Sequence, residues 1–465
     1  MNTAVKQPFY QSAFAVFLLA FLIRLGFAAD GLMKNDEERF VRPDTAGYEA
    51  PAKSLAERGI YCGPEGKVTA HRTPGFPMFL AAVGQSGGRR SISILLILLG
   101  SIAVFPVHAA CRRFASPGAA SLAALLFALN PTAIAHAPLI LSDTLFMLFS
   151  AFSILFFSMF LSDGGSPLPG GTGKKHDFFY LAYAVLFAGL GVLIRPVNLF
   201  WFLPCGLVLV FTPGLTVRTK VIAIATSVLL FTVLWFPWVV RNAGIGSGWR
   251  IDASSAVTMQ HNASALESVL TGKSGEEIRA QYQEEMRTDE MRFPEKFETE
   301  AGRLSYVERK MTKIILAHPF RYALLCMRPY TLLPDVPTLL ENCNITAGGR
   351  GTFDVLNRQG FAAAVRHYFA GHGEWLFILL PLLLAAVLLY SLAAAGAVLF
   401  AVKRDWSAFL LCVCLGLYYP LMTGPVTMPR YILPSLPLFC ICAAVAWDAL
   451  LNKMKSWKNV EKQTV

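Results

Sequence analysis

Charged residues are scarce in this chain: Asp, Glu, Lys and Arg make up 15% of its 465 residues, where a soluble domain carries about 25%. Apolar residues make up 55%. This composition argues against a disordered chain and an ordinary cytosolic enzyme. The net charge of +11 is scattered between apolar runs, whereas a nucleic-acid binder concentrates it on one soluble face. The composition therefore indicates a polytopic membrane protein.

The sequence also has no CxxC pair among its nine cysteines, so we do not expect a zinc site. Most of the cysteines lie in apolar runs and read as small buried residues. Cys62 and Cys343 fall in polar segments and could pair if those segments face an oxidising compartment. Low-complexity segments and short-period repeats are missing too, which excludes solenoids and propellers.

A clean cleavage site is missing after the first apolar run, Phe9 to Ala29. The run is longer than the apolar core of a secretory signal, and it contains Arg24. We therefore predict an uncleaved first span.

Apolar runs of nearly membrane-crossing length recur along the chain, and a helix needs about 20 mostly apolar residues to cross the hydrocarbon. The sequence predicts an all-α polytopic membrane protein with about ten spans, near residues 9–28, 91–110, 118–137, 143–161, 178–194, 197–212, 221–240, 374–401, 407–422 and 431–450.

Lys and Arg gather in alternate connections, and such clusters stay on the cytoplasmic side. With both termini inside, the cytoplasmic segments receive Lys6, Arg112 and Arg113, Lys174 and Lys175, Arg218 and Lys220, Lys403 and Arg404, and the basic C-terminal tail. Arg89 and Arg90 oppose this orientation without overturning it. We predict that both termini are cytoplasmic.

This orientation divides the chain into three regions. Residues 1–240 form an N-terminal transmembrane region with a first outer loop at 30–90, residues 241–373 form a large outer loop, and residues 374–465 form a C-terminal transmembrane region. Residues 164–173 read as a flexible cytoplasmic turn. Within the large loop, Ile314 to Leu333 is apolar but broken by charges, which suits a segment lying along the membrane surface.

Asp44 is the first candidate for chemistry. It stands in a turn set by Pro43 and Gly47, ahead of a short helix expected to begin at Pro51 and to end at Gly59. A carboxylate in this place could merely cap the turn.

Basic and acidic residues recur at the outer ends of the expected spans. Arg72 precedes a rigid Thr-Pro-Gly-Phe-Pro turn; Asp143, Arg195, Arg241 and Arg430 each lie at the end of a span. Each has a simpler role, such as helix capping for Asp143 or snorkelling for Arg72. Together, acidic and basic groups at one level of a membrane protein predict a functional site. Arginines bind phosphate oxygens, and a carboxylate accepts a proton from a hydroxyl, so the set suits displacement of a phosphate leaving group.

The stretch RPDTAGYEAPAKSLAERGIY (42–61), followed by HRTPGFPMFLAA (71–82), resembles the first outer loop of the GT-C membrane glycosyltransferases, in the protein mannosyltransferase-like and aminoarabinose transferase-like branch. The pieces LSDTLF (141–146), PWVVRN (237–242) and PRYILPSLP (429–437) extend this resemblance more thinly. It implies a GT-C-type helix bundle with outer surface helices.

The resemblance also implies roles. The catalytic carboxylates would be Asp44 and Asp143. The donor phosphate would be bound by Arg72, Arg195 and Arg430. Supporting residues would be His71, Tyr48, Arg241 and Tyr431. Many relatives carry Asp-Glu where this chain has Asp44-Thr45, which leaves the acceptor open. The metal-dependent oligosaccharyltransferases of this group use clustered outer acidic residues. We see no clear DxD in the first loop, so we expect no metal or other cofactor.

The resulting expectation is an inverting transferase in a bacterial plasma membrane, with its site on the extracytoplasmic face. It would move a sugar from a polyprenyl-phosphate-linked donor to a glycan, lipid or protein acceptor, with Asp44 as general base. Two alternatives are a lipid or solute transporter and a non-catalytic envelope-assembly protein on the same fold. Transporters usually show inverted repeats and midplane sites, which this sequence does not show.

Overall fold

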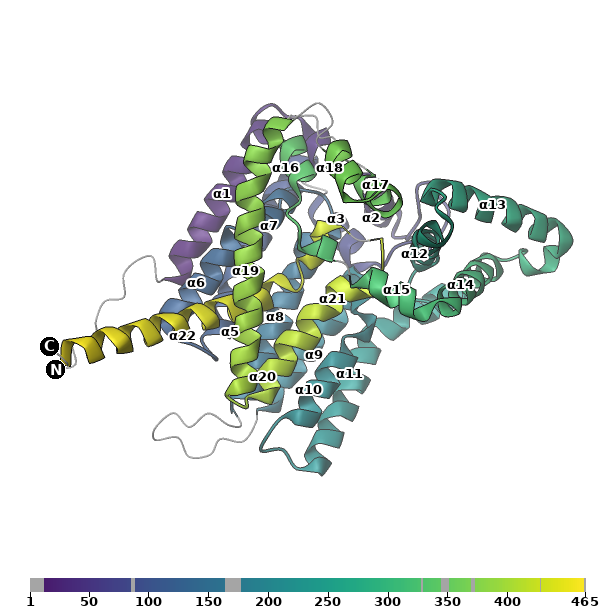
Figure 1. Ribbon diagram of the computed structural model, residues 1–465. Helices are drawn as coiled ribbons and strands as arrows, with labels where there is room; N and C mark the ends of the chain where they lie inside the picture. Colours follow the sequence, from purple (N-terminus) through teal and green to yellow (C-terminus); the bar gives the residue numbers. More distant parts are fainter. Residues whose placement is uncertain are drawn as a thin grey trace.

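The computed structural model describes residues 12–84, 88–163, 177–327, 329–343, 351–368, 373–426 and 428–463. These residues are helical almost throughout (Figure 1). Within the described ranges the only extended pairing is an antiparallel bridge between Cys62 and Val68. The expected basic residues Lys6, Lys174 and Lys175, and the expected turn at 164–173, lie outside these ranges.

Six helices are long and apolar enough to cross a membrane. They are α1 (Ala13–Met33), the nearly continuous α4 (Gly88–Ile102) and α5 (Val104–Cys111), α8 (Ser142–Asp163), α11 (Val217–Gly244), α19 (Leu376–Val402) and α22 (Leu436–Gln463). The chain is thus an all-α, multi-pass membrane protein, as predicted.

The other four expected spans coincide with shorter apolar helices. These are α6 (Pro117–Ala128), α9 (Phe178–Ile194), η3 with α10 (Pro196–Phe200 and Phe202–Phe211), and the run of α20 (Trp406–Leu410), the π-helical η7 (Leu411–Leu415) and α21 (Gly416–Met422). Ten spans therefore stays a prediction.

The expected span at 118–137 is not one continuous helix. After α6, the side chain of Asn130 accepts a hydrogen bond from the amide of Ala133 and starts α7 (Pro131–His136). Proline suits the first position of a helix but lacks the amide that a continuing helix needs. The Asn-Pro pair therefore breaks this run.

The surface helix of the first loop is longer than expected. α2 spans Ala46–Arg58, so Pro51 lies inside the helix and not in its first turn. Its end is as predicted, because Gly59 has φ 67°, a left-handed conformation that favours glycine. α3 (Gly75–Gly84) follows and packs on α2.

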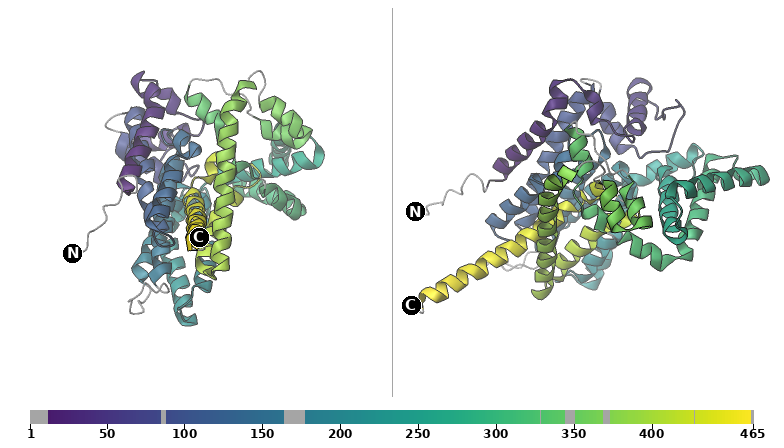
Figure 2. Two further views of the ribbon diagram at one scale, coloured as in Figure 1. Left: turned by 60° about the vertical axis from the view of Figure 1, so that its left-hand side comes forward. Right: turned by 45° about the horizontal axis from the view of Figure 1, so that its top comes forward.

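The long helices share one hydrophobic core, to which α1, α8, α9 and α22 all contribute. α1 packs on α4, α5 and α6, so the first span belongs to the bundle. α19 and α22 approach closely: a Cβ built on Gly396 would lie 2.0 Å from the carbonyl oxygen of Cys442. Figure 2 shows these two helices side by side.

All nine cysteines are free, so Cys62 and Cys343 do not pair.

The large loop folds into helices. An arm made of α12 (Ser254–Thr271), α13 (Gly275–Arg292) and α14 (Glu300–Ala317) projects sideways from the bundle (Figures 1 and 2). It has a small core of its own, formed by Ala263, Ile278, Tyr282 and Met311. α15 (Pro319–Cys326), α16 (Val336–Asn342), α17 (Thr352–Gln359) and α18 (Phe361–Tyr368) follow. Five short 3₁₀ turns complete the connections: η2 (Glu37–Phe40), η4 (Pro294–Lys296), η5 (Pro329–Leu332), η6 (Gly373–Trp375) and η8 (Pro429–Ile432).

Candidate active site

Asp44 stands in a tight turn between η2 and α2. The next residue, Thr45, anchors this turn: its hydroxyl donates to the carbonyl of Ile140 at 3.0 Å and accepts from the amide of Arg42 at 2.9 Å. Ile140 lies two residues before the start of α8, so the turn is tied to the start of the span that carries Asp143. α2 has no side-chain cap hydrogen bond, so Asp44 does not serve as its cap.

The segment that carries Arg72 is fixed against the outer end of α9. The Thr73 hydroxyl donates to the carbonyl of Ile194 at 3.1 Å. A Cβ on Gly75 would lie 2.7 Å from the carbonyl oxygen of Leu193, so only glycine permits this approach. Arg72 is thereby brought beside Arg195, which directly follows α9.

These elements bring five of the predicted residues into one ion-pair network. The two oxygens of Asp44 accept from Arg72 Nη2 and Arg430 Nη2, each at 2.7 Å. Arg430 Nη1 also lies 4.0 Å from Asp143 Oδ2. Asp143 accepts a hydrogen bond from Arg195. Asp44, Asp143, Arg72, Arg195 and Arg430 are hereafter called the reaction cluster.

The reaction cluster carries an excess of positive charge, because three guanidinium groups face two carboxylates. Burial raises the pKa of the Asp44 carboxyl, but Arg430 and Arg72 outweigh it and hold that pKa below its usual value. Asp44 is therefore ionised at neutral pH. The Nε donors of Arg72 and Arg430 are buried without a hydrogen-bond partner. A buried donor without a hydrogen-bond partner costs free energy, so an additional hydrogen-bond acceptor that binds here would stabilise the cluster.

Two tyrosines support the arginines through their ring faces. The Arg72 guanidinium lies 4.8 Å from the ring centroid of Tyr48. Tyr431 lies between Arg195 and Arg430, with centroid distances of 5.3 and 5.6 Å. Such contacts orient a guanidinium without neutralising it.

The remaining two predicted residues lie outside the network. His71 is exposed, and its backbone amide donates to the Thr69 hydroxyl. Arg241 packs 4.5 Å from the ring centroid of Trp238 and donates to the carbonyls of Thr69 and Tyr61. It therefore ties the first loop to α11.

Asp252, which the sequence reasoning did not single out, lies close to this segment. Its side chain is buried, and Oδ1 has no hydrogen-bond partner. The amide of Ala253 donates to the carbonyl of Ala70 at 2.8 Å, two residues from Arg72. Burial raises the pKa of the Asp252 carboxyl above its usual value. No local motif marks this residue.

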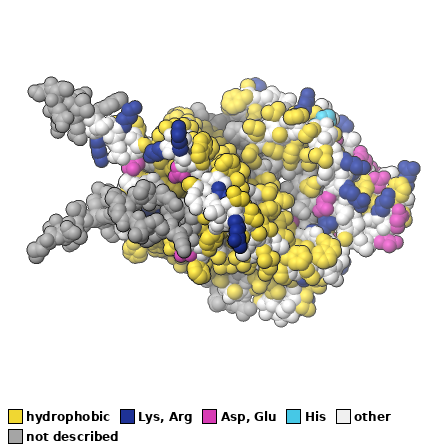
Figure 3. Space-filling model, turned by 90° about the horizontal axis from the view of Figure 1, so that it is seen from below, with side chains coloured by type: hydrophobic (Ala, Val, Ile, Leu, Met, Phe, Trp, Pro, Cys, Tyr) yellow, Lys and Arg dark blue, Asp and Glu magenta, His cyan; other side chains and the backbone are white. Residues whose placement is uncertain are grey.

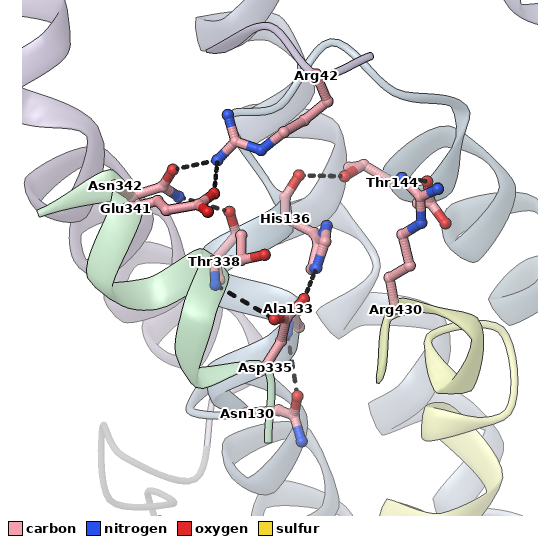
Figure 4. Close-up of polar contacts among 12 residues, drawn as sticks. Arg42, Asn130, Ala133, His136, Thr144, Asp335, Thr338, Glu341, Asn342 and Arg430 are labelled. Atoms are coloured by element: carbon pink, nitrogen blue, oxygen red, sulfur yellow. Dashed lines mark hydrogen bonds and ion pairs between the residues drawn. The ribbon is translucent and has the colours of Figure 1, made fainter. Parts of the chain in front are cut away.

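A second unpredicted feature joins α16 to the site (Figure 4). His136 Nε2 lies 2.7 Å from Asp335 Oδ2, and both residues are buried. At the other end of α16, Arg42 donates to Asn342 Oδ1 at 2.9 Å. Asp335 starts α16 by accepting from the amide of Thr338. α16 is thus held at both ends, by α7 and by the residue two positions before Asp44.

No protein-family model and no curated protein sequence matches this chain. Solved structures do match. The apo oligosaccharyltransferase of Archaeoglobus fulgidus aligns with a TM-score of 0.50 at 14% identity, over 97% of this chain and 52% of that one. The same organism's AglB, in complex with an inhibitory peptide and a dolichol-phosphate, has a TM-score of 0.49 at 15% identity, over 97% of this chain and 52% of that one.

ArnT from Cupriavidus metallidurans, bound to undecaprenyl phosphate, aligns with a TM-score of 0.43 at 13% identity, over 94% of this chain and 59% of that one. The chain spans about half the length of the oligosaccharyltransferases it matches. At 14% identity the likeness to the apo oligosaccharyltransferase shows a shared fold of membrane helices, in agreement with the fold that the sequence predicted.

Proposed function

We propose that this protein is a membrane glycosyltransferase whose donor is a sugar linked to a polyprenyl phosphate. One observation carries the proposal: Asp44 bridges Arg72 and Arg430, and each arginine keeps a buried Nε donor without a partner. A phosphate can take the place of this carboxylate as the hydrogen-bond partner of the two arginines. The shared fold with an oligosaccharyltransferase, named for glycosyl transfer, agrees with this chemistry.

The donor phosphate would compete with Asp44 for the same guanidinium groups. As the arginines turn to the phosphate, the Asp44 carboxylate loses the interactions that lower its pKa. It then becomes a stronger base at the moment when a donor is present. Arg195, paired with Asp143, would extend the positive surface along the phosphate.

The transfer itself is a displacement at the anomeric carbon. The acceptor hydroxyl oxygen bonds to that carbon, the bond from the carbon to the phosphate oxygen breaks, and the polyprenyl phosphate leaves with the bonding electrons. Asp44 takes the hydroxyl proton, and the arginines stabilise the charge on the leaving phosphate. A single displacement inverts the anomeric configuration.

The side chains of the reaction cluster suit an anion better than a divalent cation. The oxygens of Asp44 and Asp143 already contact arginines. A metal ion would have to displace these guanidinium groups and lie among three positive charges. We therefore propose that the arginines supply the electrostatic stabilisation.

The membrane placement follows from the donor. A prenyl chain can remain among apolar helices while its phosphate reaches the ends of the spans, where the reaction cluster lies. We propose that this side is the extracytoplasmic face of a bacterial plasma membrane, with both termini inside.

Purified protein incubated with a panel of polyprenyl-phosphate sugars tests the proposal. Mass spectrometry should detect released polyprenyl phosphate and glycosylated acceptor for at least one donor. The Arg72→Ala/Arg430→Ala double variant should release none. Absence of both polyprenyl-phosphate binding and release in the wild-type protein would refute the proposal, and intact donor crossing vesicle membranes would identify a transporter instead.

A further inference from the structure

We propose that the end of α14 and the whole of α15 form a lipid-binding face that anchors the arm to anionic phospholipids of the outer leaflet. Four apolar side chains define this anchor face: Leu316, Phe320, Leu324 and Met327, with exposed fractions of 67, 84, 66 and 68%. They recur at intervals of four, four and three residues. On α15 this spacing places Phe320, Leu324 and Met327 on one side, and Leu316 precedes them at the end of α14.

The chain around the anchor face carries charge of one sign. Between Arg309 and Pro334 the sequence has five Lys or Arg residues and no Asp or Glu. Lys313 and Arg321 are exposed beside the apolar row. An apolar row flanked by basic side chains fits an interfacial helix on a surface of anionic headgroups.

The anchor face continues the apolar surface of the transmembrane bundle. α15 packs against α21, which also exposes apolar side chains: Leu417, Leu421 and Met422 are 43, 41 and 45% exposed. α15 lies at the base of the arm, where the arm meets the helices (Figure 1). The space-filling view shows many apolar side chains over the bundle, and both acidic and basic ones at the end that projects from it (Figure 3).

The occupant is therefore the bilayer and not a soluble partner. Bundle and anchor face would be covered by one continuous lipid surface, and the basic residues would lie at headgroup level. The arm leaves the bundle at Asp252, whose neighbour Ala253 bonds to the Arg72 segment. Anchoring α15 would fix the second connection between the arm and the bundle, the one that follows α14.

Site-directed fluorescence in lipid nanodiscs tests this inference without any substrate. A polarity-sensitive label is placed on Leu324→Cys, and on Met291→Cys as a matched control, because Met291 is 78% exposed on α13, away from the anchor face. Both variants also carry Cys343→Ser, since Cys343 is exposed. Nitroxide-labelled phospholipids serve as quenchers in discs that contain phosphatidylglycerol.

The label at position 324 should emit at shorter wavelength and be quenched by the nitroxide lipids, whereas the label at position 291 should not. Adding Lys313→Glu and Arg321→Glu, or using purely zwitterionic discs, should reduce the quenching at position 324. Equal emission and quenching at the two positions would overturn the proposal. So would a shielded position 324 that no lipid quencher reaches, which would indicate a protein partner.

Discussion

Replacing Asp44 by Asn should have opposite effects on donor-phosphate binding and on turnover. The carboxylate now occupies Nη2 of Arg72 and Nη2 of Arg430, each at 2.7 Å. A hydrogen bond to a charged group contributes about 1.5–3 kcal/mol. The Asp44 side chain is 37% exposed, so solvent screening reduces this contribution. With the competing charge removed, polyprenyl phosphate should bind more tightly by about 1 kcal/mol, roughly fivefold.

Turnover should fall in the same variant by about 10²–10⁴-fold, because the amide cannot accept the hydroxyl proton. Polyprenyl-phosphate affinity of the purified protein and release of polyprenyl phosphate from the active donor are the two measurements. Asp30→Asn is the matched control: Asp30 also bridges two basic residues, Lys34 at 2.8 Å and Arg39 at 2.5 Å, but outside the cluster. Weaker phosphate binding in Asp44→Asn, or wild-type turnover, would refute this reasoning.

Three further predictions concern the donor phosphate, the His136–Asp335 pair and the membrane orientation. Arg72→Ala should weaken polyprenyl-phosphate binding by about 1.5–3 kcal/mol. Arg72→Lys should have an intermediate affinity, because lysine keeps the charge but loses the paired donors. Arg112→Ala is the control, and equal affinities in all variants would show that Arg72 does not bind the phosphate. Burial raises the pKa of the Asp335 carboxyl, but His136 and the hydrogen bonds from Thr338 outweigh burial and lower that pKa overall. These interactions therefore stabilise the fold above the unfolded-state pKa of about 4, and this stability is lost as pH falls through the lower folded-state value. In thermal unfolding, Asp335→Asn should lose less stability on acidification than the wild type, and parallel curves would contradict this. A cysteine at Lys403 should stay unlabelled by an impermeant reagent in intact cells, whereas labelling there would reverse the predicted orientation.

The sequence predicts much of the reaction cluster because three of its five members lie at the end of an apolar run. Asp143 begins α8, Arg195 directly follows α9, and Arg430 lies shortly before α22. Helices that cross one membrane must end at two common levels, so the membrane itself brings such residues to one face. Asp44 and Arg72 are fixed by the rigid turns around them, which the Pro and Gly residues mark.

The pairs that depend on tertiary packing could not be predicted in this way. His136 and Asp335 are 199 positions apart, and Arg42 and Asn342 are 300 apart. Neither pair belongs to a local pattern, and α16 lies in a polar loop with no membrane to set its level. The break of the 118–137 run coincides with Asn130-Pro131, but the apolar residues on both sides favour the prediction of one continuous span.

The packing of the helices in the large loop could not be predicted either. Its helices α12, α13 and α14 pack around a small core of their own, in which Tyr282 and Met311 are buried. Composition distinguishes such a segment from a span, but it does not determine how the helices pack. By contrast, the basic residues that interrupt the apolar stretch after Ile314 do predict an interfacial segment, and this stays a prediction.

A structure of the wild-type protein in lipid nanodiscs with bound polyprenyl phosphate tests the donor site most directly. We predict that the phosphate oxygens contact the guanidinium groups of Arg72 and Arg430, including their Nε donors, and that the Asp44 carboxylate has released at least one of these arginines. A phosphate bound elsewhere, with both ion pairs of Asp44 intact, would contradict the proposed function.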